Sequence, residues 1–239
     1  QVFLLIKRDG NLYLETLHVD EGYVNLPLFY PVTLDSKLLD SSEWLWGYDS
    51  GLEATAYDLP YEANILGVGR DIVAVATGAG SLPGGTIIPR QATAGNRVYF
   101  KGDLSSEPIF IGIQYEAKME MSALVLREPS KGGAGVNALT SGRLQLRNLQ
   151  INYDRTGYFR VRVSPKGKDS YEYTMTGIQL NNLASVLGTY NLRTGTFRVP
   201  IMANNLEVTI EIINDSPIPS QLLNIEWEAF YSARAQRYG

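Results

Sequence analysis

The stretch from Gly142 to Val163, GRLQLRNLQINYDRTGYFRVRV, constrains the fold more than any other part of the chain. In its second half, the apolar residues Phe159, Val161 and Val163 alternate with Tyr or Arg. A period of two is typical of a β-strand with one buried face. This half of the stretch therefore predicts a strand.

The first half of the same stretch predicts a second strand that contains a β-bulge. Its apolar residues change parity once, from Leu144 and Leu146 to Leu149, Ile151 and Tyr153. One extra residue at Arg147-Asn148 would return both sets to one face of a strand, which is what a β-bulge does. Between the two halves, Asp154-Arg155-Thr156-Gly157 is typical of a tight turn. We therefore predict a β-hairpin.

Length and composition limit the class of protein. With 239 residues, 44% of them apolar, the chain can form one large β domain or two smaller ones. It has no cysteine, which excludes disulfides, thiolate metal sites and cysteine nucleophiles. No apolar run approaches the roughly 18 to 20 residues of a membrane helix, so we expect no membrane span.

The beginning of the sequence predicts a longer parent chain. There is no initiator methionine and no signal peptide, and Val2–Ile6 already has the composition of a strand. We therefore expect the sequence to begin partway through a longer polypeptide.

Charge is distributed unequally between the two halves of the sequence. Residues 1–120 contain 8 Lys and Arg against 16 Asp and Glu, and residues 121–239 contain 13 against 9. The halves thus carry net charges of −8 and +4, which suggests different partners for different faces, or only solvated strand faces. The basic half lacks the dense Lys/Arg cluster that binding to a duplex requires.

We expect residues 1–50 to be the end of a preceding β region plus a linker. Val2–Ile6 and Leu12–Leu17 predict a hairpin around Asp9-Gly10. Prolines restrict residues 26–34 to an edge strand or an extended linker. Residues 35–50 predict a loop or short helix, whose Trp44, Trp46 and Tyr48 either anchor a core or form a contact patch.

Residues 51–130 predict a small β-barrel-like domain, because short strands follow one another with Gly/Pro turns and no helical period. The expected strands are Ile72–Ala76, Thr86–Pro89, Arg97–Phe100, Pro108–Tyr115 and Tyr115–Arg127.

Residues 131–239 predict an antiparallel β-sandwich with a mobile C-terminal tail from Ser232 onward. After the opening pair of strands we expect Tyr171–Thr176, Thr196–Ile201, Leu206–Ile213 and Ile225–Tyr231. Asn204-Asn205 predicts a turn, and Pro217-Ile218-Pro219 predicts an irregular connection. Residues 130–140 predict a flexible loop or a domain joint. The fold class is therefore all-β, a small barrel or sandwich followed by a second sandwich.

No set of residues in the sequence predicts catalysis, a cofactor or a metal. His18 is the only histidine and no nucleophile-elbow motif accompanies it. Glu226 and Glu228 share one face of a strand, about 7 Å apart, close to the separation of glycosidase carboxylates. Such pairs are common on exposed strand faces, so we expect no catalytic role. The Gly-rich loops 78–85 and 132–135 lack the Lys-Ser/Thr of a phosphate-binding loop.

Two segments resemble the C-terminal part of the tail tubular protein B (nozzle protein) family of short-tailed bacteriophages. The matching residues in the first segment are Gly142, Arg143, Leu146, Arg147, Tyr153, Thr156, Gly157, Phe159, Val161 and Val163. Those in the second are Pro217, Pro219, Glu226, Trp227, Tyr231, Arg234 and Arg237. The His/Leu-rich element of that family is replaced here by the loop around Tyr57.

The resemblance implies a structural protein of the phage tail, located in the virion. It implies a homo-oligomeric ring, expected to be a hexamer, below the tail adaptor (gatekeeper) ring. Its lumen would let double-stranded DNA pass without sequence preference, and its outside would meet tail fibres or spikes. We expect the acidic first half to contribute more to the lumen or gate and the basic second half to contact neighbouring subunits. Arg143, Arg155, Arg160 and Arg162 lining the pore would contradict this.

Two other classes of function remain open. A carbohydrate-binding or glycan-degrading β-sandwich would need a groove lined by Tyr and Trp with paired carboxylates. A receptor-binding fibre head would assemble as a trimer. Ring symmetry separates both from a nozzle.

Overall fold

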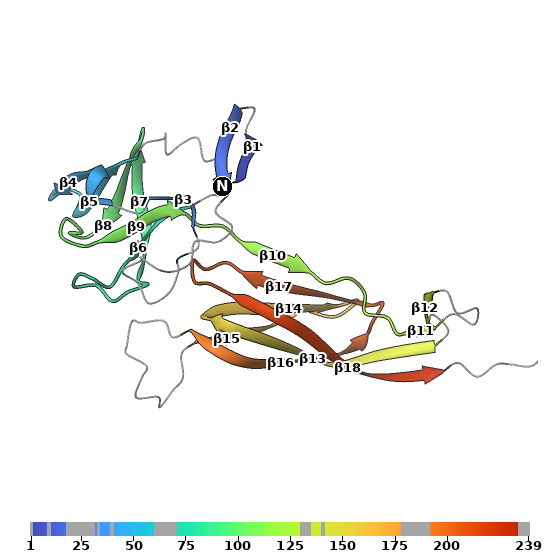
Figure 1. Cartoon of the computed structure of the whole chain (residues 1–239). Coiled ribbons are helices and arrows are strands. Elements are labelled where there is room, and N and C mark those ends of the chain that lie inside the picture. Colours follow the sequence, from blue (N-terminus) through green and yellow to red (C-terminus); the bar gives the residue numbers. More distant parts are fainter. Residues whose placement is uncertain are drawn as a thin grey trace, which may run out of the picture. The chain divides into compact units, whose positions relative to one another are not determined.

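The computed structural model describes residues 2–8, 11–17, 32, 34–38, 41–59, 71–129, 135–139, 142–177 and 192–233. The chain forms two compact units: unit 1 contains the described residues up to Tyr115, and unit 2 contains those from Glu116 onward. Both are built almost entirely from antiparallel strands (Figure 1), which confirms the predicted all-β class.

Unit 1 is dominated by one curled seven-stranded sheet. In spatial order its strands are β3 (Asp35–Leu38), β9 (Ile109–Ile113), β6 (Ile72–Ala76), β7 (Ile87–Ala94), β8 (Arg97–Lys101), β5 (Ala54–Asp58) and β4 (Leu45–Asp49). The first residues of β7 pair with β6 and the later ones with β8, with a register shift at Arg90. A shift of this kind bends a strand, which lets one sheet curl around its own core.

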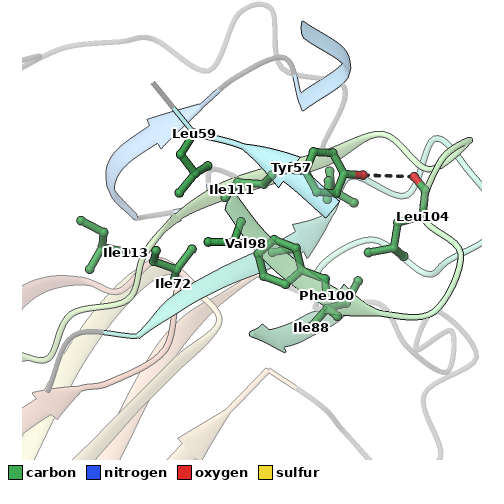
Figure 2. Packing of buried hydrophobic residues seen from close by; sticks show 11 residues of the cluster. Tyr57, Leu59, Ile72, Ile88, Val98, Phe100, Leu104, Ile111 and Ile113 are labelled. Atoms are coloured by element: carbon green, nitrogen blue, oxygen red, sulfur yellow. Dashed lines mark hydrogen bonds between the residues drawn. The ribbon is translucent and has the colours of Figure 1, made fainter. Parts of the chain in front are cut away.

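The core of unit 1 follows from continuous apolar runs in the sequence. Every residue of β6 (IVAVA) and β9 (IFIGI) is buried, as expected of strands covered on both faces. Tyr57 packs edge-to-face on Phe100, with ring centroids 6.0 Å apart, and its hydroxyl donates to the Leu104 carbonyl at 3.2 Å (Figure 2). Burial raises the pKa of Tyr57 to about 12. The hydroxyl therefore stays a proton donor inside an apolar cluster.

The start of unit 1 corrects one prediction and confirms another. Residues 35–50, predicted as loop or short helix, contain a short 3₁₀ helix at Ser41–Trp44, but they also contain the strands β3 and β4, which were not predicted. In β4, Leu45 packs on the core and Trp46 faces outward, which is the alternation of a strand. The segment forms a strand because it pairs with β5. Upstream, β1 (Val2–Arg8) and β2 (Asn11–Leu17) form the predicted antiparallel pair.

Unit 2 is a sandwich of two antiparallel sheets beside a small ribbon. The four-stranded sheet contains, in order, β10 (Ala117–Glu120), β17 (Val208–Asn214), β14 (Tyr158–Pro165) and β15 (Tyr171–Thr176). The three-stranded sheet contains β16 (Arg193–Asn204), β13 (Gly142–Thr156) and β18 (Gln221–Ala233). The ribbon pairs β11 (Arg127–Pro129) with β12 (Val136–Ala138).

The predicted hairpin at residues 142–163 is wrong in its pairing. Strands β13 and β14 do form, but β13 pairs with β16 and β18, whereas β14 pairs with β15 and β17. The predicted tight turn at Asp154–Gly157 is also wrong: β13 continues to Thr156 through a register shift, with Arg155 at a φ of 42°, and only Gly157 separates it from β14. The chain therefore passes from one sheet to the other at Gly157. The apolar faces of the two strands meet in one buried cluster, through Leu149 and Ile151 on one side and Phe159 and Val161 on the other.

Three smaller predictions for unit 2 are tested by the observed strand pairing and hydrogen bonds. The bulge is confirmed, since both partners of β13 show a register shift between Leu146 and Asn148. The Asn204 turn is also confirmed, since its carbonyl accepts from the Glu207 amide at 3.0 Å. The strand predicted over 115–127 is shorter, and covers only β10.

Other predictions fall outside the described residues. They are the Asp9-Gly10 turn, His18, most of segment 26–34, most of loop 132–135, and residues 234–239 of the predicted tail, which include Arg234 and Arg237. The first two residues of that tail, Ser232 and Ala233, are not a mobile end but the last residues of β18.

Candidate interaction surfaces

The two carboxylates considered for catalysis lie on the outer face of β18. Glu228 is 3.5 Å from the Arg147 guanidinium and 3.4 Å from that of Arg198, and it accepts from the Asn148 amide at 3.0 Å. Glu226 stands opposite Gln150 on the same face. A general acid must be free to exchange a proton with a substrate, whereas the Glu228 carboxylate is engaged by two arginines and the Asn148 side-chain amide. This pair suits cross-strand stabilisation better than acid–base chemistry.

The Gly-rich loop 78–85 binds a carboxylate of the chain itself. Glu107 accepts from the Ser81 amide at 2.9 Å, the Leu82 amide at 3.2 Å and the Ser81 hydroxyl. These hydrogen bonds, the Ser81 hydroxyl foremost, hold the pKa of the Glu107 carboxyl below its usual value of 4.5. Gly80 permits the approach, because a Cβ there would lie closer than 3.0 Å to the carboxylate. The anion-binding geometry of this loop is thus occupied internally.

Glu107 is expected to give unit 1 an acid-sensitive contribution to stability. Because its pKa is lowered on folding, the contribution is present above pH 4.5 and is lost as pH falls through the folded-state pKa. Glu107→Gln should lower the unfolding free energy by about 1–3 kcal/mol at pH 7 and by less at pH 3. Urea titrations at both pH values test this. The exposed Glu43→Gln is the control, and equal losses at the two pH values would contradict the assignment.

The outer face of the four-stranded sheet carries a network of ion pairs. Arg160 lies 3.0 Å from both Glu172 and Asp215, and Arg162 lies 2.6 Å from Glu172. Further pairs join Arg160 to Glu116, Arg162 to Glu211, and Lys118 to Glu211. The two arginines, Arg162 foremost, lower the pKa of Glu172. Three cations among four carboxylates leave no excess positive charge for phosphate on this face.

An aromatic patch lies on the outer side of β4. Trp46 is 53% exposed, and the Arg97 guanidinium stacks 4.2 Å from its ring centroid. Asp58 fixes that guanidinium through two hydrogen bonds of 2.6 and 3.0 Å. Tyr48 is exposed two residues along the strand. The core-anchoring alternative is confirmed for Trp44, which packs on the core, whereas Trp46 and Tyr48 are exposed and their use as a contact patch stays a prediction.

Within the described part of the chain, no three His, Cys, Asp or Glu residues lie close enough to share a metal ion. In the same residues, no helix has the length and apolar character to cross a membrane.

Comparison with known proteins identifies the family. The profile of the family described as bacteriophage nozzle protein matches residues 1–238. The chain belongs to the bacteriophage nozzle protein family. It is also similar to the tail tubular protein gp12 of Escherichia phage T7, with 29% identity over 134 residues. That match covers 56% of this chain but only 17% of the T7 protein. Membership of the nozzle family places the chain among the structural proteins of the phage virion tail.

The residues that carried the nozzle resemblance hold the sandwich of unit 2 together. Gly142 faces the Tyr231 ring so closely that a Cβ there would overlap it. The buried Thr156 hydroxyl accepts from the Gln221 amide at 2.9 Å, which ties the end of β13 to the start of β18. Trp227 packs against the core from β18. These positions serve the fold.

Sequence reasoning missed two of the arrangements described above. Glu107 reaches Ser81 across 26 positions in the sequence, and Arg97 reaches Asp58 across 39. No local pattern marks such distant partners, because only strand pairing brings them together.

Proposed function

We propose that this chain is part of a nozzle subunit that forms a homo-oligomeric ring, a hexamer, extending the DNA ejection channel of a short phage tail. The ring would join the adaptor ring on one side and tail fibres or spikes on the other. The match of the nozzle family to residues 1–238 carries this proposal. A sheet-built subunit suits a ring because extended strands offer long, mixed surfaces for neighbouring copies.

The charge distribution supports passage of DNA without retention. Unit 2 contains the basic excess, yet Arg160 and Arg162 are paired with carboxylates. Each phosphate contact that a free cation makes strengthens binding, so compensated cations leave DNA mobile. We infer that acidic residues of unit 1 contribute more to the lumen, where they would repel phosphate.

We also infer that the chain has no enzymatic activity. Glu228 is committed to Arg147 and Arg198, and the Gly-rich loop is filled by Glu107. The competing glycan-degrading function needs paired carboxylates that can exchange protons with a substrate. The arrangement around Glu228 opposes that function.

Imaging tests the proposed ring. Negative-stain images of the full-length parent protein should show six-fold rings with a central channel, and light scattering should give the mass of six copies. Three-fold particles would favour a fibre head. Release of reducing sugar from a capsular glycan, abolished by Glu226→Gln with Glu228→Gln, would favour the glycan-degrading alternative instead.

A further inference from the structure

The edges of the two sheets in unit 2 are protected unequally. Open sheet edges invite pairing with other chains, and proteins block them with short strands, proline or bulges. Strands β10 and β15 are short, with 4 and 6 residues. Strand β16 contains Pro200, which lacks an amide proton, and Met202 with a φ of 49°. Three of the four edges thus carry a blocking feature.

The fourth edge, β18, carries none of these features along most of its length. It has 13 residues without proline, glycine or lysine, and its register to β13 shifts at Leu223, near its start. From Asn224 to Ala233 the strand itself is continuous. Among the described residues, β13 is its only hydrogen-bonded neighbour (Figure 1). From Asn224 to Phe230, roughly 20 Å of strand edge thus has no second neighbouring strand in the part of the chain that the structure describes.

The residues beside this edge are of the kind found in interfaces. Phe230 is 63% exposed on the outer face, with the Arg147 guanidinium 4.7 Å from its ring centroid. Leu223 is also exposed. On the inner face, Ile225 and Trp227 are only partly buried, although they pack against the core. Aromatic, apolar and Arg side chains are enriched at protein interfaces, and a strand added at the edge would cover them.

Electrostatics indicates which surface pairs with β18. If two β18 strands paired with each other over their whole length, Glu226 of each would stand opposite Glu228 of the other, which is unfavourable. Residues 1–115 contain 7 Lys and Arg against 14 Asp and Glu, whereas residues 116–239 contain 14 against 11. The two units thus have net charges of −7 and +3. The three-stranded sheet itself carries five arginines against three carboxylates, Glu226 and Glu228 included, so it attracts an acidic strand. Contact between unlike surfaces of successive copies is the arrangement that closes into a ring.

We propose that the open edge of β18 is an assembly site, where a strand from the acidic unit of a second copy adds to the three-stranded sheet in head-to-tail order. This inference rests on the proposed ring and specifies one of its contacts. The added backbone hydrogen bonds provide affinity, and the side chains of Leu223 and Phe230 are covered by the incoming strand.

Hydrogen exchange of the full-length parent protein, assembled and unassembled, tests the site. Peptides from 221–233 should exchange at least tenfold more slowly in the assembly. Peptides from the blocked edges β15 and β16 should exchange at the same rate in both states. Leu223→Lys with Phe230→Lys should raise the protein concentration needed for assembly at least tenfold. The control Leu206→Lys, at a residue that is 73% exposed in a turn, should leave it unchanged.

The outcomes separate this inference from the proposed function. Rings that form while β18 exchanges at the unassembled rate would overturn the assignment of the edge and leave the nozzle function standing. Two-fold dimers protected at β18 would overturn the head-to-tail pairing. If the parent protein forms no oligomer, both the ring and its contact are overturned.

Discussion

Replacing Phe159 by alanine is expected to lower the unfolding free energy of unit 2 by about 3–5 kcal/mol. Phe159 is fully buried on β14, and its ring packs edge-to-face on Tyr153 at 5.9 Å and on Phe197 at 5.5 Å, measured between centroids. Those partners belong to β13 and β16 of the opposite sheet. The substitution therefore leaves a cavity where the two sheets meet.

Urea titration followed by hydrogen exchange measures this loss in unit 2 and leaves unit 1 as an internal reference. Phe230→Ala is the matched control, since it removes the same side chain from an exposed site on β18. It should change the unfolding free energy by no more than about 1 kcal/mol, because it loses only the stacking of the Arg147 guanidinium on the ring. Similar losses for the two variants would show that Phe159 does not join the sheets.

Replacing Gly157 by alanine is expected to lower the unfolding free energy by about 1–3 kcal/mol. A Cβ at this position would lie closer than 3.0 Å to Ile218 Cγ2. The backbone cannot move away easily, because the Gly157 amide donates to the Pro219 carbonyl at 3.0 Å and its carbonyl accepts from the Gly177 amide at 2.8 Å. Position 157, where the chain passes between the sheets, therefore has no room for a side chain.

A double-mutant cycle tests the cause of this destabilisation. Ile218→Ala removes the obstructing methyl group, so the double variant should be more stable than the sum of the single losses predicts, by at least about 0.5 kcal/mol. Gly135→Ala is the control, because nothing lies within 4 Å of a Cβ there. Strict additivity of Gly157→Ala and Ile218→Ala would contradict the proposed overlap.

The sequence alone predicted the main strands of the two facing sheets of unit 2 and their buried faces, but it missed the ribbon, since β12 lies in the segment 130–140 that was expected to be a loop or domain joint. Alternation identified Phe159, Val161 and Val163 as one buried face, and the parity change at Arg147-Asn148 identified the bulge. Regular spacing between Gly/Pro turns likewise predicted the strands that became β6 and β9. These features are local, because side-chain direction alternates along every strand whatever its neighbours are.

Only the tertiary structure decided which strands are neighbours. A segment such as Asp154–Gly157 can return the chain within one sheet or let it pass to the facing sheet, and the alternation on either side is the same in both cases. Here the contacts of Gly157 with Ile218, and of Thr156 with Gln221, select the second arrangement. For the same reason, the sequence shows neither the contact of Glu107 with Ser81 nor the position of β18 at the edge of its sheet. Pairing between distant segments is a property of the packed chain.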